Sequence, residues 1–166
     1  MQTLITSILR IVQFLLVLLS TALIGNVIAS NISGSESAIN FIMFVCALSW
    51  VAVLYGLAAQ FVSVLAIPIV ALALDAAASL FTFIGAIVLS AKLKAVNCSN
   101  LHGHPSDYIA YGSSNDEKRC REIQASTVFL WFLWVSFVGT LFFIVTEFRR
   151  GPGSLRSGPN MSQVGV

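Results

Sequence analysis

Side chains that could do chemistry are few in this chain, because only 10% of its 166 residues are charged. His102 and His104, with Asp107 close by, are the one group that resembles a metal site. Zinc sites draw on three or four ligands, whereas the chain holds just these two histidines, two positions apart. No nucleophile–base pairing and no glycine-rich phosphate loop is evident either. We therefore expect no metal, no cofactor and no enzymatic activity.

Asp75 is the acidic residue that stands inside an apolar stretch, about 15 Å from Leu65 if the intervening chain is helical. An acid at such depth is costly in a bilayer and usually faces a partner inside a helix bundle. Polar side chains expected at similar depth or nearer the cytoplasm are Ser49, Trp50, Tyr55, Ser136 and Thr140. A structural hydrogen bond is the favoured role, with a lipid or partner contact and a proton path as alternatives. In the favoured role, Asp75→Asn should be tolerated and Asp75→Leu should not.

Cys98 and Cys120 lie together in one polar segment, whereas Cys46 stands alone in an apolar one. Two cysteines in a single loop of a membrane protein indicate a disulfide formed in an oxidising compartment. The glycosylation motifs that begin at Asn31 and Asn97 would lie on the same side. These features place the loop outside the cytoplasm and both termini inside it.

The elements that hold these residues are membrane-spanning helices, because 57% of the chain is apolar, too much for a soluble fold of this size to bury. The few charges divide the chain into gaps, and a crossing needs about 20 apolar residues. The gap from Ser37 to Leu74 would extend about 57 Å as one helix, so it must turn, near Gln60 and before Pro68. We expect an all-α membrane bundle in residues 1–150, with spans at about 9–29, 38–61, 65–91 and 124–147.

Two segments flank these spans. Ser114 and Glu117 fit a capping box that would start the last helix well above the bilayer. Residues 151–166 are rich in Gly, Pro and Ser, which is typical of a flexible cytoplasmic tail. The basic residues Arg10, Arg149 and Arg150 lie at the cytoplasmic membrane boundary, so we expect them to contact anionic lipid. A net charge of +2, scattered along the chain, gives no sign of nucleic-acid binding.

Small and bulky residues are segregated between helices. A stripe of small side chains, typical of close helix packing, follows residues 38–61 and 65–91 at spacings of three and four: Ala52, Gly56, Ala59, Ala71, Asp75, Ala78, Thr82 and Gly85. The last span is rich in large aromatic residues that we expect to face lipid or a partner, among them Trp131, Trp134, Phe142 and Phe143.

Several motifs together resemble the fungal non-classical-export family of MARVEL-domain proteins. They are Leu54-Tyr55-Gly56-Leu57-Ala58-Ala59-Gln60-Phe61, Pro68, Leu74-Asp75, Phe81-Thr82-Phe83, the loop cysteines, Arg119-Cys120-Arg121 with Gln124-Ala125, and Ser162-Gln163-Val164-Gly165-Val166. The resemblance implies a four-helix bundle with cytoplasmic termini and an extracellular cysteine pair. It also implies residence in eisosome-linked plasma-membrane microdomains and a link to sphingolipid. Family members have longer tails, and no catalytic residues carry over.

We therefore expect a non-enzymatic organiser of plasma-membrane domains that binds lipid, with sphingolipid or sterol as candidates, and either self-associates or binds a larger membrane protein. An accessory subunit of a larger transporter or pump is the first alternative. A small channel or transporter is the second.

Overall fold

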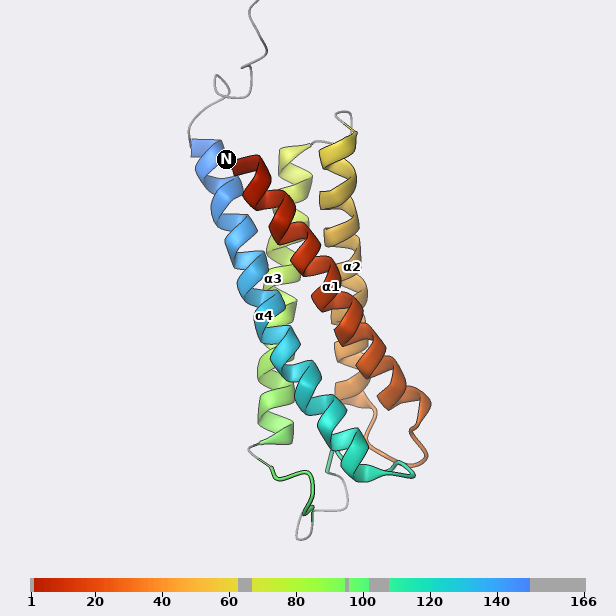
Figure 1. The fold of residues 1–166 in the computed structure, drawn as a ribbon. Coiled ribbons are helices and arrows are strands. Elements are labelled where there is room, and N and C mark those ends of the chain that lie inside the picture. The colour runs from red at the N-terminus through yellow and green to blue at the C-terminus, as the bar shows by residue number, and fades with distance from the viewer. Residues whose placement is uncertain (1, 63–66, 95, 102–107, 150–166) are drawn as a thin grey trace, which may run out of the picture.

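The computed structural model describes residues 2–62, 67–94, 96–101 and 108–149, and these form four long helices (Figure 1). The helices are α1 (Gln2–Ala29), α2 (Ser37–Phe61), α3 (Pro68–Leu93) and α4 (Asp116–Arg149). Each is long and apolar enough to cross a membrane. The predicted all-α bundle of four membrane helices is therefore confirmed.

The helices form a ring in which neighbours run antiparallel (Figure 1). Helix α1 packs against α2 and α4, and α3 packs against the same two helices, whereas the backbones of the diagonal pairs do not approach each other within the described residues. We call the end where α1 begins and α4 ends the termini-side end. The opposite end, which carries the α1–α2 and α3–α4 connections, is the loop-side end.

Local signals set the helix boundaries. Pro68 is the first residue of α3, where its missing N–H costs no helical hydrogen bond; residues 65–66 of the span expected there lie outside the described residues. The cap of α4 differs from the expected one by one position. Asn115, rather than Ser114, caps the helix, because its Oδ1 accepts a hydrogen bond from the Lys118 N–H at 3.0 Å. The helix begins at Asp116, before the apolar span, as expected.

Backbone hydrogen bonds join the α1–α2 connection to the α3–α4 connection at the loop-side end. The Ile32 N–H donates to the Gly112 carbonyl at 2.8 Å, and Asn31 pairs with Ser113 in an antiparallel bridge. Gly112 has a φ of +99°, and a Cβ there would lie 2.2 Å from the backbone nitrogen of Gly34, so glycine is required at this crossing. A disulfide between Cys98 and Cys120, with Cα atoms 5.6 Å apart, ties the segment after α3 to the first turns of α4.

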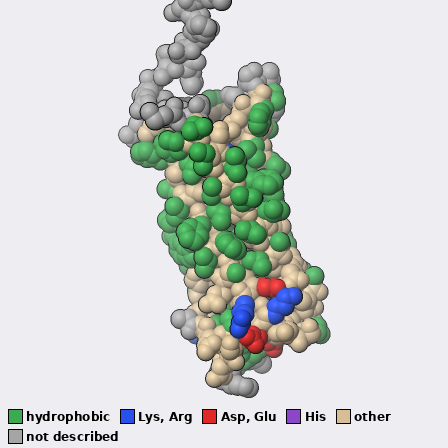
Figure 2. Space-filling view, viewed as in Figure 1, with side chains coloured by type: hydrophobic (Ala, Val, Ile, Leu, Met, Phe, Trp, Pro, Cys, Tyr) green, Lys and Arg blue, Asp and Glu red, His purple; other side chains and the backbone are tan. Residues whose placement is uncertain are grey.

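The small-residue stripe packs inside the bundle. Ala52, Ala78, Thr82 and Gly85 are buried, and a Cβ on Gly85 would lie 3.1 Å from Ile42 Cδ1 on α2. The outer surface is instead an apolar belt between the two ends (Figure 2). Its most exposed large side chains on the spans include Leu4, Ile11, Val51, Ile69, Leu80, Phe132, Val135 and Phe142.

The disulfide generates a first prediction. Replacing both Cys98 and Cys120 by Ser should lower the stability of the bundle by roughly 3 kcal/mol, since the bond restricts the unfolded chain. Thermal unfolding in detergent measures the loss, with Cys46→Ser as a control that keeps the bond. Maleimide should label Cys98 and Cys120 in unfolded wild-type protein only after reduction. Labelling of both thiols without reductant would contradict the bond.

Candidate functional site

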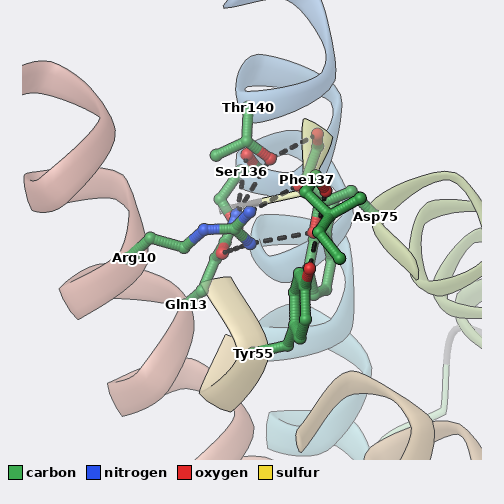
Figure 3. Close-up of polar contacts among 8 residues, drawn as sticks. Arg10, Gln13, Tyr55, Asp75, Ser136, Phe137 and Thr140 are labelled. Atoms are coloured by element: carbon green, nitrogen blue, oxygen red, sulfur yellow. Dashed lines mark hydrogen bonds and ion pairs between the residues drawn. The ribbon is translucent and has the colours of Figure 1, made fainter. Parts of the chain in front are cut away.

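A salt bridge between Arg10 and Asp75 crosses the centre of the bundle near its termini-side end (Figure 3). Arg10 Nη1 donates to Asp75 Oδ1 at 2.8 Å, and Nη2 donates to Oδ2 at 2.6 Å, so the pairing is bidentate. The Arg10 side chain is 3% exposed and that of Asp75 is fully buried. Because α1 and α3 are diagonal partners, this bridge joins two helices whose backbones do not touch.

Gln13 extends the bridge to α4. Its Oε1 accepts a second hydrogen bond from Arg10 Nη1 at 2.9 Å. Its Nε2 donates to the Ser136 carbonyl at 3.1 Å and to Thr140 Oγ1 at 3.3 Å. Arg10 and Gln13 are three residues apart and so project from the same face of α1. We refer to Arg10, Gln13, Asp75 and Thr140 as the polar centre.

Gly56 supplies the space that the guanidinium occupies. A Cβ at this position on α2 would lie 2.4 Å from both Cζ and Nε of Arg10. The guanidinium is thus packed directly on the α2 backbone, and every helix of the ring contributes to the polar centre or its walls. Arg10 Nε is buried there without a hydrogen-bond partner among the described residues.

The expected lipid contact of Arg10 is therefore wrong, because its side chain turns inward and pairs with an acid. Asp75 does face the interior, as expected, and its bidentate partner there is a cation, Arg10. Sequence reasoning assigned Arg10 to the membrane boundary because it precedes the apolar run. The available signal was the Arg10–Gln13 spacing, since two long polar side chains share one face at the start of an otherwise apolar helix.

Other polar residues that were expected near Asp75 form hydrogen bonds with backbone carbonyl groups. Ser49 Oγ donates to the Val45 carbonyl in its own helix, and Thr82 Oγ1 donates to that of Ala78. Tyr55 Oη lies 3.5 Å from the carbonyl oxygen of Ile67 at the start of α3. Ser136 contributes its backbone carbonyl, while its hydroxyl bonds to Leu133 in α4.

A second buried cation, Arg119, lies at the loop-side end. It is 2% exposed, and it donates to the Ile109 carbonyl at 3.0 Å, to Asn31 Oδ1 at 2.8 Å and to the Val27 carbonyl at 3.3 Å. It thereby joins α4 to the end of α1 and to both loops. In the sequence, Arg119 stood out only as part of the Arg119-Cys120-Arg121 motif. Nothing there indicated that its side chain is buried, because two of its three acceptors are backbone carbonyls.

The aromatic residues of α4 divide between packing and exposure. Trp131 and Trp134 are half-buried and form edge and tilted contacts with Phe83 on α3, and Trp131 Nε1 donates to Ser90 Oγ at 3.3 Å. Phe142 is 65% exposed, whereas Phe143 is half-buried. His102, His104, Asp107, Arg150 and the tail 151–166 lie outside the described residues, as does the side chain of Arg149.

In the polar centre the two charged groups bind each other directly. The arrangement therefore serves to hold helices together. Among the described residues no three His, Cys, Asp or Glu side chains gather in a metal-binding cluster. Both carboxylate oxygens of Asp75 accept from Arg10, which leaves a bidentate geometry suited to holding two helices in register.

The family model for MARVEL, described as a membrane-associating domain, matches residues 3–143. The chain belongs to the MARVEL family. This MARVEL protein is similar to Non-classical export protein 2 of Saccharomyces cerevisiae, with 34% identity covering 96% of this chain and 93% of the relative. It is 32% identical to Non-classical export protein 102 of Candida albicans, covering 95% and 96%. No solved structure matches the chain significantly. The fungal family indicated by the sequence motifs is thus confirmed.

The salt bridge generates a second prediction, which replaces the expected tolerance of Asp75→Asn. Asp75→Asn, Asp75→Leu and Arg10→Met should each destabilise the bundle by about 3 kcal/mol or more, because each leaves an uncompensated charge or unpaired donor in a buried site. The double variant Arg10→Met/Asp75→Leu should be more stable than either single change. Folded yield and thermal unfolding in detergent measure this cycle. Additive losses in the double variant would show that the two residues act independently.

Gly56 generates a third prediction. Gly56→Ala should displace the Arg10 guanidinium and weaken folding nearly as much as loss of the salt bridge. Gly25→Ala on α1 is the matched control, since its Cβ would meet only Met43 Cε at 3.8 Å. In the Arg10→Met/Asp75→Leu background, Gly56→Ala should have little further effect on the unfolding temperature. An equal loss in both backgrounds would mean that Gly56 acts through something other than Arg10.

Proposed function

We propose that this MARVEL protein is a non-enzymatic organiser of plasma-membrane microdomains of the eisosome type, with both termini in the cytoplasm. In this role its helices bind membrane lipids, including sphingolipid or sterol, and associate with other copies or other membrane proteins. The family match and the four membrane-spanning helices support a membrane-associated role of this kind.

The observation that carries the proposal is the division between a closed polar interior and an apolar exterior. The two charges of the polar centre are engaged with each other, and many outward-facing side chains of the described helices are large and apolar (Figure 2). We expect such a surface to work by packing against lipids or other proteins in the bilayer. Large rigid side chains such as Phe132 and Phe142, 60% and 65% exposed, offer flat faces to lipid rings and chains.

The same interior argues against an ion or solute path. A transporter needs polar groups that line a water-filled cavity and exchange partners. In the polar centre the Asp75 oxygens are both occupied by Arg10, and the guanidinium rests on the α2 backbone at Gly56. The polar centre therefore fills the middle of the ring at this level and connects all four helices.

Microscopy of the fluorescently tagged chain in fungal plasma membrane tests this function. The wild-type protein should concentrate in static patches, and Phe132→Ala/Phe142→Ala should reduce that concentration severalfold while leaving the unfolding temperature unchanged. Leu80→Ala is the control, because Leu80 is 57% exposed on α3 but lacks an aromatic ring. Uniform distribution of the wild-type chain would overturn the proposal. Native purification with a stoichiometric large transporter would instead favour the accessory-subunit role.

A further inference from the structure

A small cavity of about 50 Å³ lies at the loop-side end, between the end of α1 and the start of α2. The α1–α2 connection and the start of α4 lie side by side at this end (Figure 1). The polar side chains that line the cavity are two amides and two opposite charges: Asn31, Asn40, Glu36 and Arg119. A space of this size is large enough for a few water molecules and too small for a lipid headgroup.

Arg119 brings one unused donor group to this cavity. Its Nε and Nη1 donate to the carbonyls of Ile109 and Val27 and to Asn31 Oδ1. Its Nη2 has no acceptor among the described residues, yet Nη2 is not one of the unpartnered atoms that are sealed from solvent. Nη2 lies toward the α1–α2 connection, because a Cβ on Gly34 would lie 3.0 Å from it. Since Arg119 is only 2% exposed and lines the cavity, the cavity is where Nη2 meets solvent.

Glu36 supplies the opposite charge from the start of α2. Its carbonyl accepts from the Asn40 N–H at 2.8 Å, so Glu36 is the N-cap residue of that helix. Its carboxylate Oε1 accepts from Asn31 Nδ2 at 2.7 Å. Glu36 also acts electrostatically on Arg119, although no direct ion pair joins these two described residues. The two charges therefore line one space without touching.

Water is the ligand that this set of groups fits. A buried water forms about three hydrogen bonds, and the cavity offers a guanidinium donor from Arg119, a carboxylate acceptor from Glu36 and the side-chain amide of Asn40. An anion would be repelled by Glu36 and a cation by Arg119. A bridging water costs little entropy and gives nearly the enthalpy of a direct hydrogen bond.

We propose that ordered water in this cavity connects Arg119 to Glu36 and so joins α4 to α2. These two helices are a diagonal pair of the ring, whose backbones do not approach each other within the described residues. The direct bridge between Arg10 and Asp75 joins the other diagonal pair at the opposite end. Each diagonal of the ring thus has a polar connection, one direct and one hydrated. The water site goes beyond the proposed function, which concerns the lipid-facing exterior.

Nuclear magnetic resonance of the full wild-type chain in lipid nanodiscs, with isotope-labelled arginine, tests the site. The guanidinium N–H signals, assigned through bonds to the backbone, are examined for cross-peaks with water. Arg119 should show a cross-peak with a bound water. Arg10 is the matched control and should show none, because both of its Nη atoms donate to Asp75 or Gln13 and its unpartnered Nε is sealed from solvent.

A charge-removing variant tests the bridge to α2. Glu36→Gln should weaken the Arg119–water cross-peak severalfold, because a neutral amide holds the water less tightly than a carboxylate does. Glu117→Gln is the matched control and should leave the cross-peak unchanged, since Glu117 is an acid at the same end that does not line this cavity.

A wild-type spectrum without the Arg119 cross-peak would overturn the proposal, and so would cross-peaks of equal strength on Arg119 and Arg10. An effect of Glu117→Gln as large as that of Glu36→Gln would contradict the bridge to α2. The first comparison uses wild-type protein, so it does not depend on whether a variant folds. If wild-type protein forms membrane patches yet lacks the bound water, this site is wrong while the proposed function stands.

Discussion

The bundle depends on one interaction, the salt bridge that Arg10 and Asp75 form across the ring. Charges cost several kcal/mol to bury unless they are paired and hydrogen-bonded, and inside a bilayer no water is available to relieve them. The pair therefore constrains which residues can pack around it. Gly56 has no side chain because the guanidinium occupies that space. Gln13 connects the pair to α4, where a backbone carbonyl receives its amide. The small residues of α3 follow from the same demand, since α2 and α3 must lie close enough to enclose the carboxylate.

The two ends of the molecule are held by different means. At the termini-side end, an ion pair is buried among the four helices. At the loop-side end, the disulfide and the backbone bridge join the two connections, and Arg119 binds neutral acceptors from three segments. The loop-side arrangement needs no acid in contact with Arg119, because several oriented carbonyl and amide oxygens together stabilise the guanidinium. The apolar belt thus lies between two ends that are cross-linked in different ways.

Much of this architecture could be predicted from the sequence, and the rest could not for a physical reason. Gaps between charges and the position of Pro68 located the helices, and two cysteines in one polar segment gave the disulfide. Asp75 was recognised as an inward-facing acid. Its partner was missed because lipid and protein interior are equally apolar, so periodicity does not reveal which face of α1 turns inward. Arg119 was missed because burial on backbone carbonyls leaves no pattern of side chains. The cap of α4 shifted by one residue, since Ser114 and Asn115 are both competent caps.

The separation of Arg10 and Asp75 along the chain also governs the order of assembly at the ribosome. The two residues are 65 positions apart in the chain, which corresponds to roughly 3–13 s of translation at about 5–20 residues per second. During that interval α1 carries an unneutralised cation, and Arg10 stands only eight residues after the start of the helix. A side chain so placed can extend toward the headgroups until the third helix arrives. The ion pair, and with it the final packing of the first helix against the rest of the bundle, can form only after the third helix has been synthesised.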